Sequence, residues 1–281
     1  MGRLKDLLSL IKFSHTIFAL PFALSAMLVA ADGLPPLRTF LLILVCMVSA
    51  RTAAMAFNRY LDAELDARNP RTANREIPRG IIKKNSALNL AVGSAVGFAI
   101  AAGLINALTM LLAPFAIFVL FFYSYAKRFT DFSHLILGLA LGLAPIAAWI
   151  AVTGSLALVP LLLGLGVTLW VAGFDIIYAT QDYEFDKRER LHSLVVRLGI
   201  PRALWTARLF HLTALLIWIL FGILVQAILP YYLGLALCAA LLVYEHRLIH
   251  PNDLSRVNAA FFNMNGYISI VFLAGVALSI L

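Results

Sequence analysis

Long apolar runs alternate with short polar connections along the whole chain. A run of about 20 apolar residues is long enough to cross a hydrocarbon core of about 30 Å as an α-helix. We predict about nine helical spans, at approximately 10–31, 38–57, 86–105, 108–125, 133–152, 157–180, 204–225, 228–245 and 259–280. The alternating pattern of barrel strands is absent. The sequence therefore predicts an all-α polytopic membrane protein, a bundle of about nine transmembrane helices in which 1–281 form a single transmembrane domain.

The composition is typical of a membrane-embedded chain. Of its 281 residues, 62% are hydrophobic and 13% are charged, whereas a soluble domain carries about 25% charged residues. The two cysteines, Cys46 and Cys238, lie inside apolar runs and indicate packing rather than a disulfide or a metal site. The formal net charge of +8 is explained by basic cytoplasmic loops, so we expect a lipid bilayer and no nucleic acid as the partner surface.

Basic residues fall on alternate connections between the predicted spans. Almost all of the 22 Lys and Arg residues precede the first span or lie in every second connection, and Arg38 is the exception on the other side. Cytoplasmic loops of membrane proteins carry this excess of positive charge. We therefore predict a multi-pass protein of the cell inner (cytoplasmic) membrane, with its N-terminus and its charged loops on the cytoplasmic side.

A first cluster of chemistry-bearing residues continues the second predicted span. Asn58, Asp62 and Asp66 are spaced four residues apart, which places them on one face of a helix. Arg51 falls on the same face, about two turns deeper in the membrane. Ionisable residues inside a membrane span are costly and mark a functional site by default, so Arg51 is a candidate for substrate binding.

A second cluster repeats this arrangement in the other half of the chain. Asp175, Tyr178, Asp182 and Asp186 share one helical face at the end of the sixth predicted span. Asp182 and Asp186 have the same four-residue spacing as Asp62 and Asp66, and each pair leads into a long basic loop. A weak internal repeat of this kind would place both acidic pairs at one mouth of a helix bundle.

The two acidic pairs need a cation between them. Carboxylates that face one another repel unless positive charge intervenes, and oxygen ligands from a few carboxylates plus substrate phosphates suit Mg²⁺. Lys127, Arg71 and Arg75 lie in the neighbouring loops and are suited to phosphate oxygens. The sequence thus predicts a Mg²⁺-bridged diphosphate. One alternative is that these charged residues are simply exposed to solvent at the ends of loops. The other is that Arg51 and Asp175 form a buried ion pair that has no catalytic role.

These residues closely resemble the motifs of the UbiA superfamily of intramembrane prenyltransferases. The family's first motif, N-x-x-x-D-x-x-x-D followed by R-T-x-x-R and P-x-G, is matched by Asn58, Asp62, Asp66, Arg71, Thr72, Arg75, Pro78 and Gly80. The second, D-x-x-Y-A-x-x-D-x-x-x-D, is matched by Asp175, Tyr178, Ala179, Asp182 and Asp186. A tyrosine–lysine pair between the motifs stands here as Tyr123 and Lys127. The resemblance covers essentially the whole chain.

The resemblance implies Mg²⁺-dependent transfer of a polyprenyl group from polyprenyl diphosphate to a small aromatic acid acceptor such as 4-hydroxybenzoate, in ubiquinone or menaquinone biosynthesis. The implied catalytic and metal-binding residues are Asp62, Asp66, Asp182 and Asp186, with Asn58 as a further metal ligand. The implied diphosphate-binding residues are Lys127, Arg71, Arg75 and Tyr123. For the acceptor we expect Arg51, whose guanidinium fork fits a carboxylate, together with Asp175 and Tyr178.

Two positions depart from the family pattern. Arg59 follows the motif asparagine where many members carry aspartate, and Glu76 stands where a proline often follows the arginine. Neither is an expected metal ligand, so they bear on the acceptor rather than on the reaction type. The alternatives are a prenyltransferase of the futalosine menaquinone route, another UbiA-type acceptor such as a haem or a lipid ether, and, from a different class, a cation-coupled membrane transporter.

Overall fold

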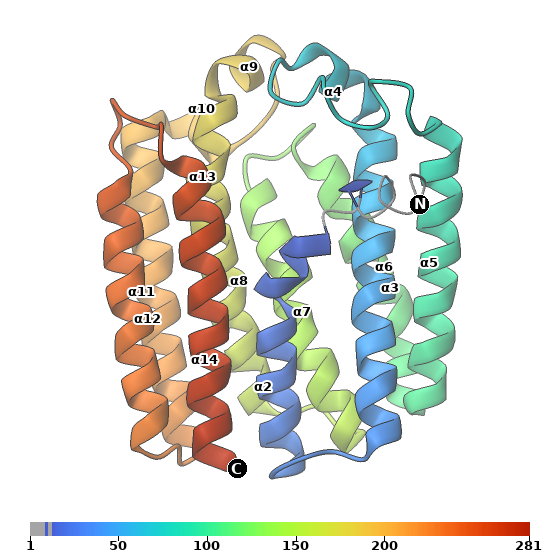
Figure 1. Ribbon diagram of the computed structural model, residues 1–281, viewed down its shortest axis with the longest axis vertical. Coiled ribbons are helices and arrows are strands. Elements are labelled where there is room, and N and C mark those ends of the chain that lie inside the picture. Colours follow the sequence, from blue (N-terminus) through green and yellow to red (C-terminus); the bar gives the residue numbers. More distant parts are fainter. Residues whose placement is uncertain (1–8, 11–12) are drawn as a thin grey trace. The chain divides into compact units, whose positions relative to one another are not determined.

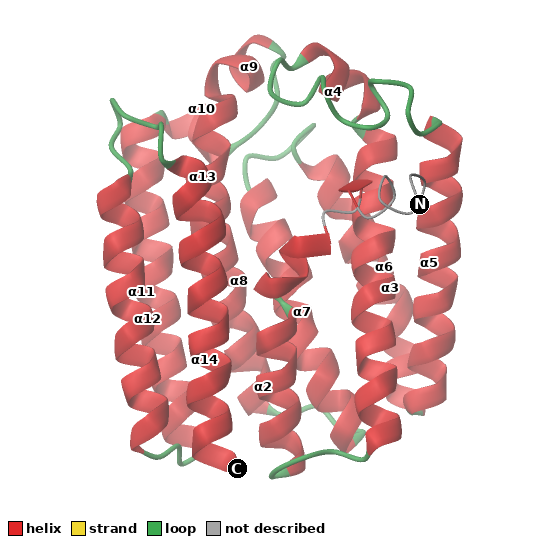
Figure 2. Cartoon of the chain, viewed as in Figure 1, coloured by secondary structure: helices red, strands yellow, loops and turns green. Residues whose placement is uncertain are grey.

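The computed structural model describes residues 9–10 and 13–281, and these residues form helices joined by loops, with no β-strand among them (Figure 2). Eight of the helices are long and apolar enough to cross a membrane. This confirms the predicted all-α, multi-pass architecture. The first predicted span, 10–31, corresponds to a shorter apolar helix, Thr16–Ala31, and residues 11–12 of that span lie outside the described part of the chain.

The described chain divides into two compact units. One contains Leu37–Tyr125 together with the described residues before Ile17, and the other contains Ile17–Pro36 and Ala126–Leu281. Each unit therefore carries one of the two acidic motifs. The single domain spanning 1–281 stays a prediction.

The first unit is built on three long helices. They are α3 (Leu37–Leu61), α5 (Lys84–Ile105) and α6 (Ala107–Ala126), and the short α4 (Ala63–Arg68) follows α3 directly. Helices α3 and α5 pack against each other. Small side chains such as Ala87 and Ala91 are fully buried on α5 and allow this close packing.

The second unit contains five long helices and several short ones. The long helices are α7 (Ser133–Thr153), α8 (Leu158–Ala179), α11 (Ile200–Leu224), α12 (Leu229–Leu248) and α14 (Asn265–Ile280). The shorter elements are α2 (Leu20–Ala31), η2 (Thr180–Asp182), α9 (Tyr183–Arg188), α10 (Leu194–Leu198), α13 (Val257–Ala259) and the π-helical η3 (Ala260–Met264). The short helix η1 (Phe13–Phe18) begins in the first unit and ends in the second. Helix α8 packs between α7 and α11, and α12 packs against α14 (Figure 1).

Aromatic side chains fill the interior of the second unit. Phe22, Trp170, Trp218 and Phe272 are almost completely buried, and their ring centroids lie 4.8–6.1 Å apart. Aromatic rings bury large apolar areas and prefer such offset or tilted contacts. Large apolar side chains elsewhere on the long helices are exposed, Leu111 to 73% and Leu216 to 57% for example, as expected for surfaces that face lipid.

Glycines bring α7 and α8 unusually close. A Cβ atom added at Gly138 of α7 would lie 2.1 Å from the backbone oxygen of Thr168 on α8, and one at Gly142 would lie 2.5 Å from the backbone oxygen of Gly164. Only glycine fits at such a crossing, because small residues are what allow two membrane helices to approach backbone to backbone. This close crossing fixes the positions of the side chains near the start of α7 and near the end of α8.

Candidate functional site

The first acidic motif lies at the junction of α3 and α4. Asn58 is in the last turn of α3, and its Nδ2 donates a hydrogen bond of 3.1 Å to Asp62 Oδ2. Asp62 occupies the junction itself, immediately before Ala63, and is only 2% exposed. Two of the predicted metal ligands are thus in direct contact at this junction, and the backbone N–H groups of Asp62 and Asp66 continue the helical hydrogen bonds through it, to the backbone oxygens of Asn58 and Asp62.

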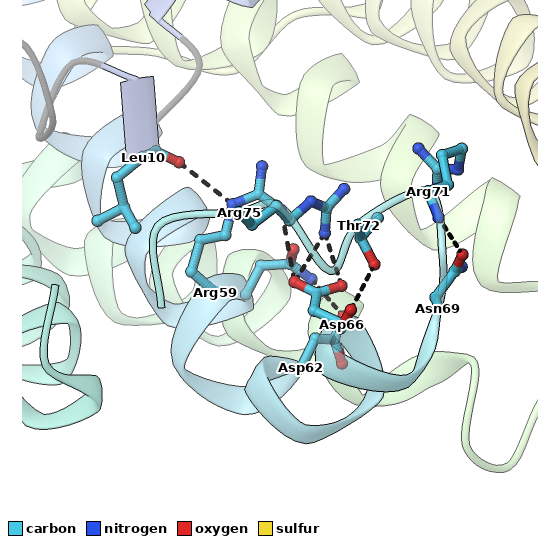
Figure 3. A network of polar contacts seen from close by, with 9 residues as sticks. Leu10, Arg59, Asp62, Asp66, Asn69, Arg71, Thr72 and Arg75 are labelled. Carbon is cyan, nitrogen blue, oxygen red and sulfur yellow. Dashed lines mark hydrogen bonds and ion pairs between the residues drawn. The ribbon is translucent and has the colours of Figure 1, made fainter. Parts of the chain in front are cut away.

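Asp66 forms the centre of an ion-pair network (Figure 3). Arg75 Nη1 lies 2.7 Å from Oδ1 and 2.8 Å from Oδ2 of this carboxylate, and Arg59 Nη1 lies 3.9 Å from Oδ2. Both Asp66 and Arg59 are about 95% buried. A buried carboxylate is stable only with opposite charge and hydrogen bonds beside it, and the two arginines supply both.

The loop after α4 folds back and returns Arg75 to Asp66. The Thr72 hydroxyl donates to the backbone oxygen of Asp66 at 3.0 Å, and the Asn69 side chain accepts from the backbone N–H of Arg71 at 2.9 Å (Figure 3). Local side-chain hydrogen bonds of this kind replace the helical ladder where a helix ends. Gly80 ends the folded loop with φ +73°, a conformation that glycine adopts without strain.

Arg59, one of the two departures from the family pattern, takes part in this network. In addition to its contact with Asp66, its Nε donates to the backbone oxygen of Leu10 at 3.3 Å. Arg59 therefore links α3 to Leu10 and adds positive charge beside a predicted metal ligand. Glu76, the second departure, accepts a hydrogen bond from the hydroxyl of Ser9.

The remaining predicted residues of the first unit are spread over three elements. Arg51 lies on α3, two turns before Asn58, and is half-buried. Tyr123 is in the last turn of α6 and is also half-buried. Arg71 is an exposed loop residue. The structure thus brings Asn58, Asp62, Asp66 and Arg75 together, whereas the ligands of Arg51, Tyr123 and Arg71 stay predictions.

The second acidic motif spans three consecutive elements of the second unit. Asp175 and Tyr178 lie in the last two turns of α8, Asp182 ends η2, and Asp186 lies in α9. All four are half-buried. The 3₁₀ turn between α8 and α9 has about 3.0 rather than 3.6 residues per turn, so these side chains do not follow one ideal α-helical stripe.

Asp175 has a partner that the sequence did not reveal. His134 Nδ1 lies 2.7 Å from Asp175 Oδ2, and the imidazole is 97% buried on the first turn of α7. His134 lies 41 residues before Asp175, and no local motif connects the two. The close crossing of α7 and α8 at Gly138, one turn after His134, is the feature that brings the histidine to the carboxylate.

The loop that carries Lys127 is tied to the loop that follows the second motif. The backbone N–H of His192 donates to the backbone oxygen of Lys127 at 2.7 Å. Asp131 lies 3.1 Å from His192 Nδ1 and 3.3 Å from Arg197 Nη1. These contacts hold a predicted diphosphate-binding lysine in the same unit as Asp182 and Asp186, and sequence reasoning had not assigned any role to Asp131, His192 or Arg197.

Aromatic rings surround the end of α8. Tyr178 contacts Phe261 with ring centroids 4.3 Å apart, and Phe261 in turn packs edge-on against Phe174 at 5.3 Å. Phe18 lies 5.4 Å from both phenylalanines. Asp175 therefore lies one helical turn from an aromatic wall, next to Phe174.

The oxygen-only donors of the first motif fit Mg²⁺ by type. Mg²⁺ is typically held by one or two carboxylates and completed by waters and substrate phosphates, and Asn58, Asp62 and Asp66 offer such oxygens at one junction. Within residues 9–10 and 13–281, no three or more His, Cys, Asp or Glu side chains are grouped closely enough to hold a metal ion unaided. A metal at this junction would need phosphate oxygens as well, and the complete ligand set stays a prediction.

Comparison with known proteins identifies the family. The family model described as the UbiA prenyltransferase family matches residues 19–267. The chain belongs to the UbiA prenyltransferase family. This confirms the resemblance drawn from the two acidic motifs and identifies the chain as a membrane-embedded prenyltransferase.

Relatives of known activity match almost the full length. The chain is 32% identical over 258 residues to the 4-hydroxybenzoate octaprenyltransferase of Vibrio cholerae serotype O1, covering 91% of this chain and 89% of that enzyme. It is 34% identical over 267 residues to the enzyme of the same name from Aeromonas hydrophila, covering 95% and 92%. The similarity therefore includes both acidic motifs and the helices that carry them.

Solved structures of the family have the same fold. The apo structure of a UbiA homolog from Aeropyrum pernix K1 superposes with a TM-score of 0.85 at 30% identity, covering 95% of this chain and 98% of that one. A UbiA homolog from Archaeoglobus fulgidus, solved with DMAPP and Mg²⁺, gives a TM-score of 0.69 at 19% identity, covering 95% and 99%. The second likeness shows the shared fold.

Proposed function

We propose that this UbiA-family prenyltransferase transfers a polyprenyl group from polyprenyl diphosphate to an aromatic acid of the 4-hydroxybenzoate type in quinone biosynthesis. The observation that carries the proposal is the 32–34% identity, over at least nine-tenths of the chain, to 4-hydroxybenzoate octaprenyltransferases. The distribution of Lys and Arg supports a site at the cytoplasmic side of the inner membrane.

The acids of both motifs would act on the diphosphate of the donor. Asn58, Asp62, Asp66, Asp182 and Asp186 would hold Mg²⁺, which when bound neutralises the leaving diphosphate as a Lewis acid. The Archaeoglobus homolog, solved with DMAPP and Mg²⁺, supports the choice of metal. Arg75 already lies beside Asp66 and would add fixed positive charge, and Arg71, Lys127 and Tyr123 would contact phosphate oxygens.

The acceptor would be bound by groups of a different chemistry. Arg51 lies two turns deeper on α3 than Asn58 and would pair with the carboxylate of the acid. Tyr178 and Asp175 would line the acceptor pocket beside the aromatic wall of Phe174 and Phe261. As the carbon–oxygen bond of the donor breaks, its electron pair leaves with the diphosphate. A ring carbon of the acceptor then bonds to the prenyl carbon, and the ring gives up one proton to a base, for which Asp182 and the departing diphosphate are the candidates.

One assay tests this function. Purified protein in detergent would receive polyprenyl diphosphate, Mg²⁺ and 4-hydroxybenzoate, with products followed by mass spectrometry. We expect prenylated 4-hydroxybenzoate, which disappears on chelation of Mg²⁺ and in Asp62→Ala. Unchanged donor with every aromatic acid in a panel would contradict the proposal, and cation flux in liposomes would then favour a transporter.

The same panel addresses the departures from the family pattern. Arg59 stands where many family members carry an aspartate, and it is buried next to Asp66. The charge around the first motif therefore differs from the charge in those members. A second aromatic acid that is prenylated faster than 4-hydroxybenzoate would replace it as the proposed acceptor, and the proposed reaction type would stay unchanged.

A further inference from the structure

His134 is a buried polar side chain with a specific polar contact. It is 3% exposed, and the one hydrogen bond that its side chain makes to a described residue joins Nδ1 to Asp175 Oδ2 at 2.7 Å. Its other ring nitrogen, Nε2, is buried and has no hydrogen-bond partner within the described residues. An ionised carboxylate only accepts hydrogen bonds, so the proton of the contact is on Nδ1, and the unpartnered Nε2 favours the tautomer without a second N–H.

Simple packing does not account for a histidine at this position. A buried imidazole with an unpaired nitrogen costs free energy that a leucine of similar size would not. The neighbouring crossing of α7 and α8 is formed by glycines and by Thr168, so the helices are held together without the histidine. What His134 adds is one fixed N–H directed at one carboxylate oxygen.

Asp175 keeps one oxygen fixed and the other open. Its side chain is 19% exposed, and the contact with His134 is its one hydrogen bond in the described chain. Tyr178, one turn further along the same face of α8, packs on Phe261 and places an aromatic wall beside the carboxylate. An open carboxylate oxygen next to aromatic rings suits the hydroxyl group of a phenolic ligand.

We propose that His134 is a positioning residue: it fixes Asp175 Oδ2 so that Asp175 Oδ1 accepts a hydrogen bond from the hydroxyl group of the aromatic acceptor. This inference rests on the proposed function and assigns to His134 a part in acceptor recognition. The hydrogen bond orients the phenol and raises the electron density of its ring, which favours attack by the ring carbon. In this proposal His134 has no part in binding the donor diphosphate.

The test separates donor from acceptor kinetics. His134→Phe keeps a ring but has no N–H to donate to Asp175. We expect kcat/KM for 4-hydroxybenzoate to fall about 10- to 100-fold, the range found when the hydrogen-bond partner of a functional side chain is removed. The KM for polyprenyl diphosphate should change less than about threefold. His134→Gln keeps a neutral N–H donor of similar reach and should recover most of the activity.

A double variant distinguishes positioning from an independent effect. If His134 acts through Asp175, then His134→Phe should add little to the loss caused by Asp175→Asn. Losses of activity that multiply in the double variant would overturn the proposal, and so would equal losses of kcat/KM for the prenyl diphosphate and for the acceptor. His134→Leu provides a second variant without a donor. Unfolding of all three His134 variants, measured by thermal denaturation in detergent, would assign the pair a purely structural role and also overturn it.

Failure of the inference is distinguishable from failure of the proposed function. A wild-type protein that prenylates no aromatic acid refutes the function itself. A wild-type protein that is active, with His134→Phe equally active towards 4-hydroxybenzoate, refutes only the role of His134.

Discussion

Asp66 and Asp175 each lie 2.7 Å from a nitrogen of a basic side chain, but the two carboxylates are held in different ways. Asp66, in the first unit, contacts Arg75 through both oxygens and has Arg59 beside it. Asp175, in the second unit, contacts one nitrogen of His134 and keeps part of its surface exposed. Arginine is always charged, whereas a neutral imidazole is enough to donate one hydrogen bond.

The difference indicates what each carboxylate is built for. A carboxylate surrounded by fixed positive charge suits a site that binds a cation and an anion together, such as Mg²⁺ and a diphosphate. A carboxylate that accepts a single N–H beside aromatic rings has a second oxygen that can accept a hydrogen bond from a ligand. We therefore propose that the two units contribute different chemistry, and each part of this comparison is open to experiment.

The largest expected effect is at Asp66. Asp66→Asn removes a predicted metal ligand and leaves Arg75 and Arg59 without their counter-charge, so we expect kcat to fall by about two to three orders of magnitude or more. The measurement is prenyl transfer at saturating Mg²⁺. Glu64→Gln on the same short helix is the matched control, because the Glu64 side chain is 85% exposed and forms a surface ion pair with Lys84. Its activity should stay within about twofold of wild type. Equal losses would remove the distinction between the buried and the exposed acid.

Under the proposed function, Arg51 would give the first unit a part in binding the acceptor as well as the donor. Arg51→Ala should raise the KM for the aromatic acid about 10- to 100-fold, because a charged hydrogen-bonding partner of a carboxylate is worth about 1.5–3 kcal/mol. The KM for polyprenyl diphosphate should change little. Arg51→Lys retains the charge and should lie between Arg51→Ala and wild type. Loss of affinity for both substrates alike would contradict the assigned role.

Gly138 tests whether the close crossing of α7 and α8 positions Asp175. Gly138→Ala introduces a Cβ atom 2.1 Å from the backbone oxygen of Thr168, and the helices must separate, at a cost of about 1–3 kcal/mol in stability. The same substitution at Gly93 on α5 meets no atom within 4 Å and should be neutral. Thermal unfolding in detergent and kcat/KM for the acceptor give the two readouts. Equal behaviour of the two variants would show that the crossing tolerates the added atom.

The smallest expected kinetic effect is at Asn265, next to a third buried acid. Asn265 Nδ2 donates to Glu245 Oε1 at 2.8 Å, and both side chains are fully buried. Asn265→Leu leaves a buried oxygen without its donor and should lower stability by about 1–3 kcal/mol with little change in prenyl transfer. Asn263→Leu, two residues earlier at an exposed position, should leave stability unchanged. A large loss of activity in Asn265→Leu without loss of stability would show that Glu245 also belongs to the catalytic chemistry.

Sequence reasoning predicted the architecture because hydropathy determines which segments span a membrane. The boundaries of the long helices agree within a few residues, α3 for example extending to Leu61 where a span ending at 57 was expected. The first predicted span proved to be a shorter apolar helix. The local motif spacing likewise indicated that Asn58, Asp62 and Asp66 belong together, because residues four apart share a helical face.

The partners of these residues were beyond the sequence. Arg59 was noted only as a departure from a family pattern, and its contact with Asp66 depends on how the chain turns between α3 and α4. His134 contacts Asp175 because glycines allow two helices to cross closely, which no local pattern in either helix reveals. Long-range contacts of this kind are set by packing, and a lone histidine near the start of an apolar run carries no signal of its partner.

The central claim is that the acids of the two motifs act on one Mg²⁺-bound diphosphate. The most direct measurement is the affinity of a non-reactive prenyl diphosphate analogue, with and without Mg²⁺, for wild type, Asp62→Asn, Asp182→Asn and the double variant. We predict that either substitution abolishes most of the Mg²⁺-dependent affinity and that the double variant binds about as weakly as each single one. Independent, multiplying losses, or Mg²⁺-dependent binding that survives either substitution, would contradict the claim.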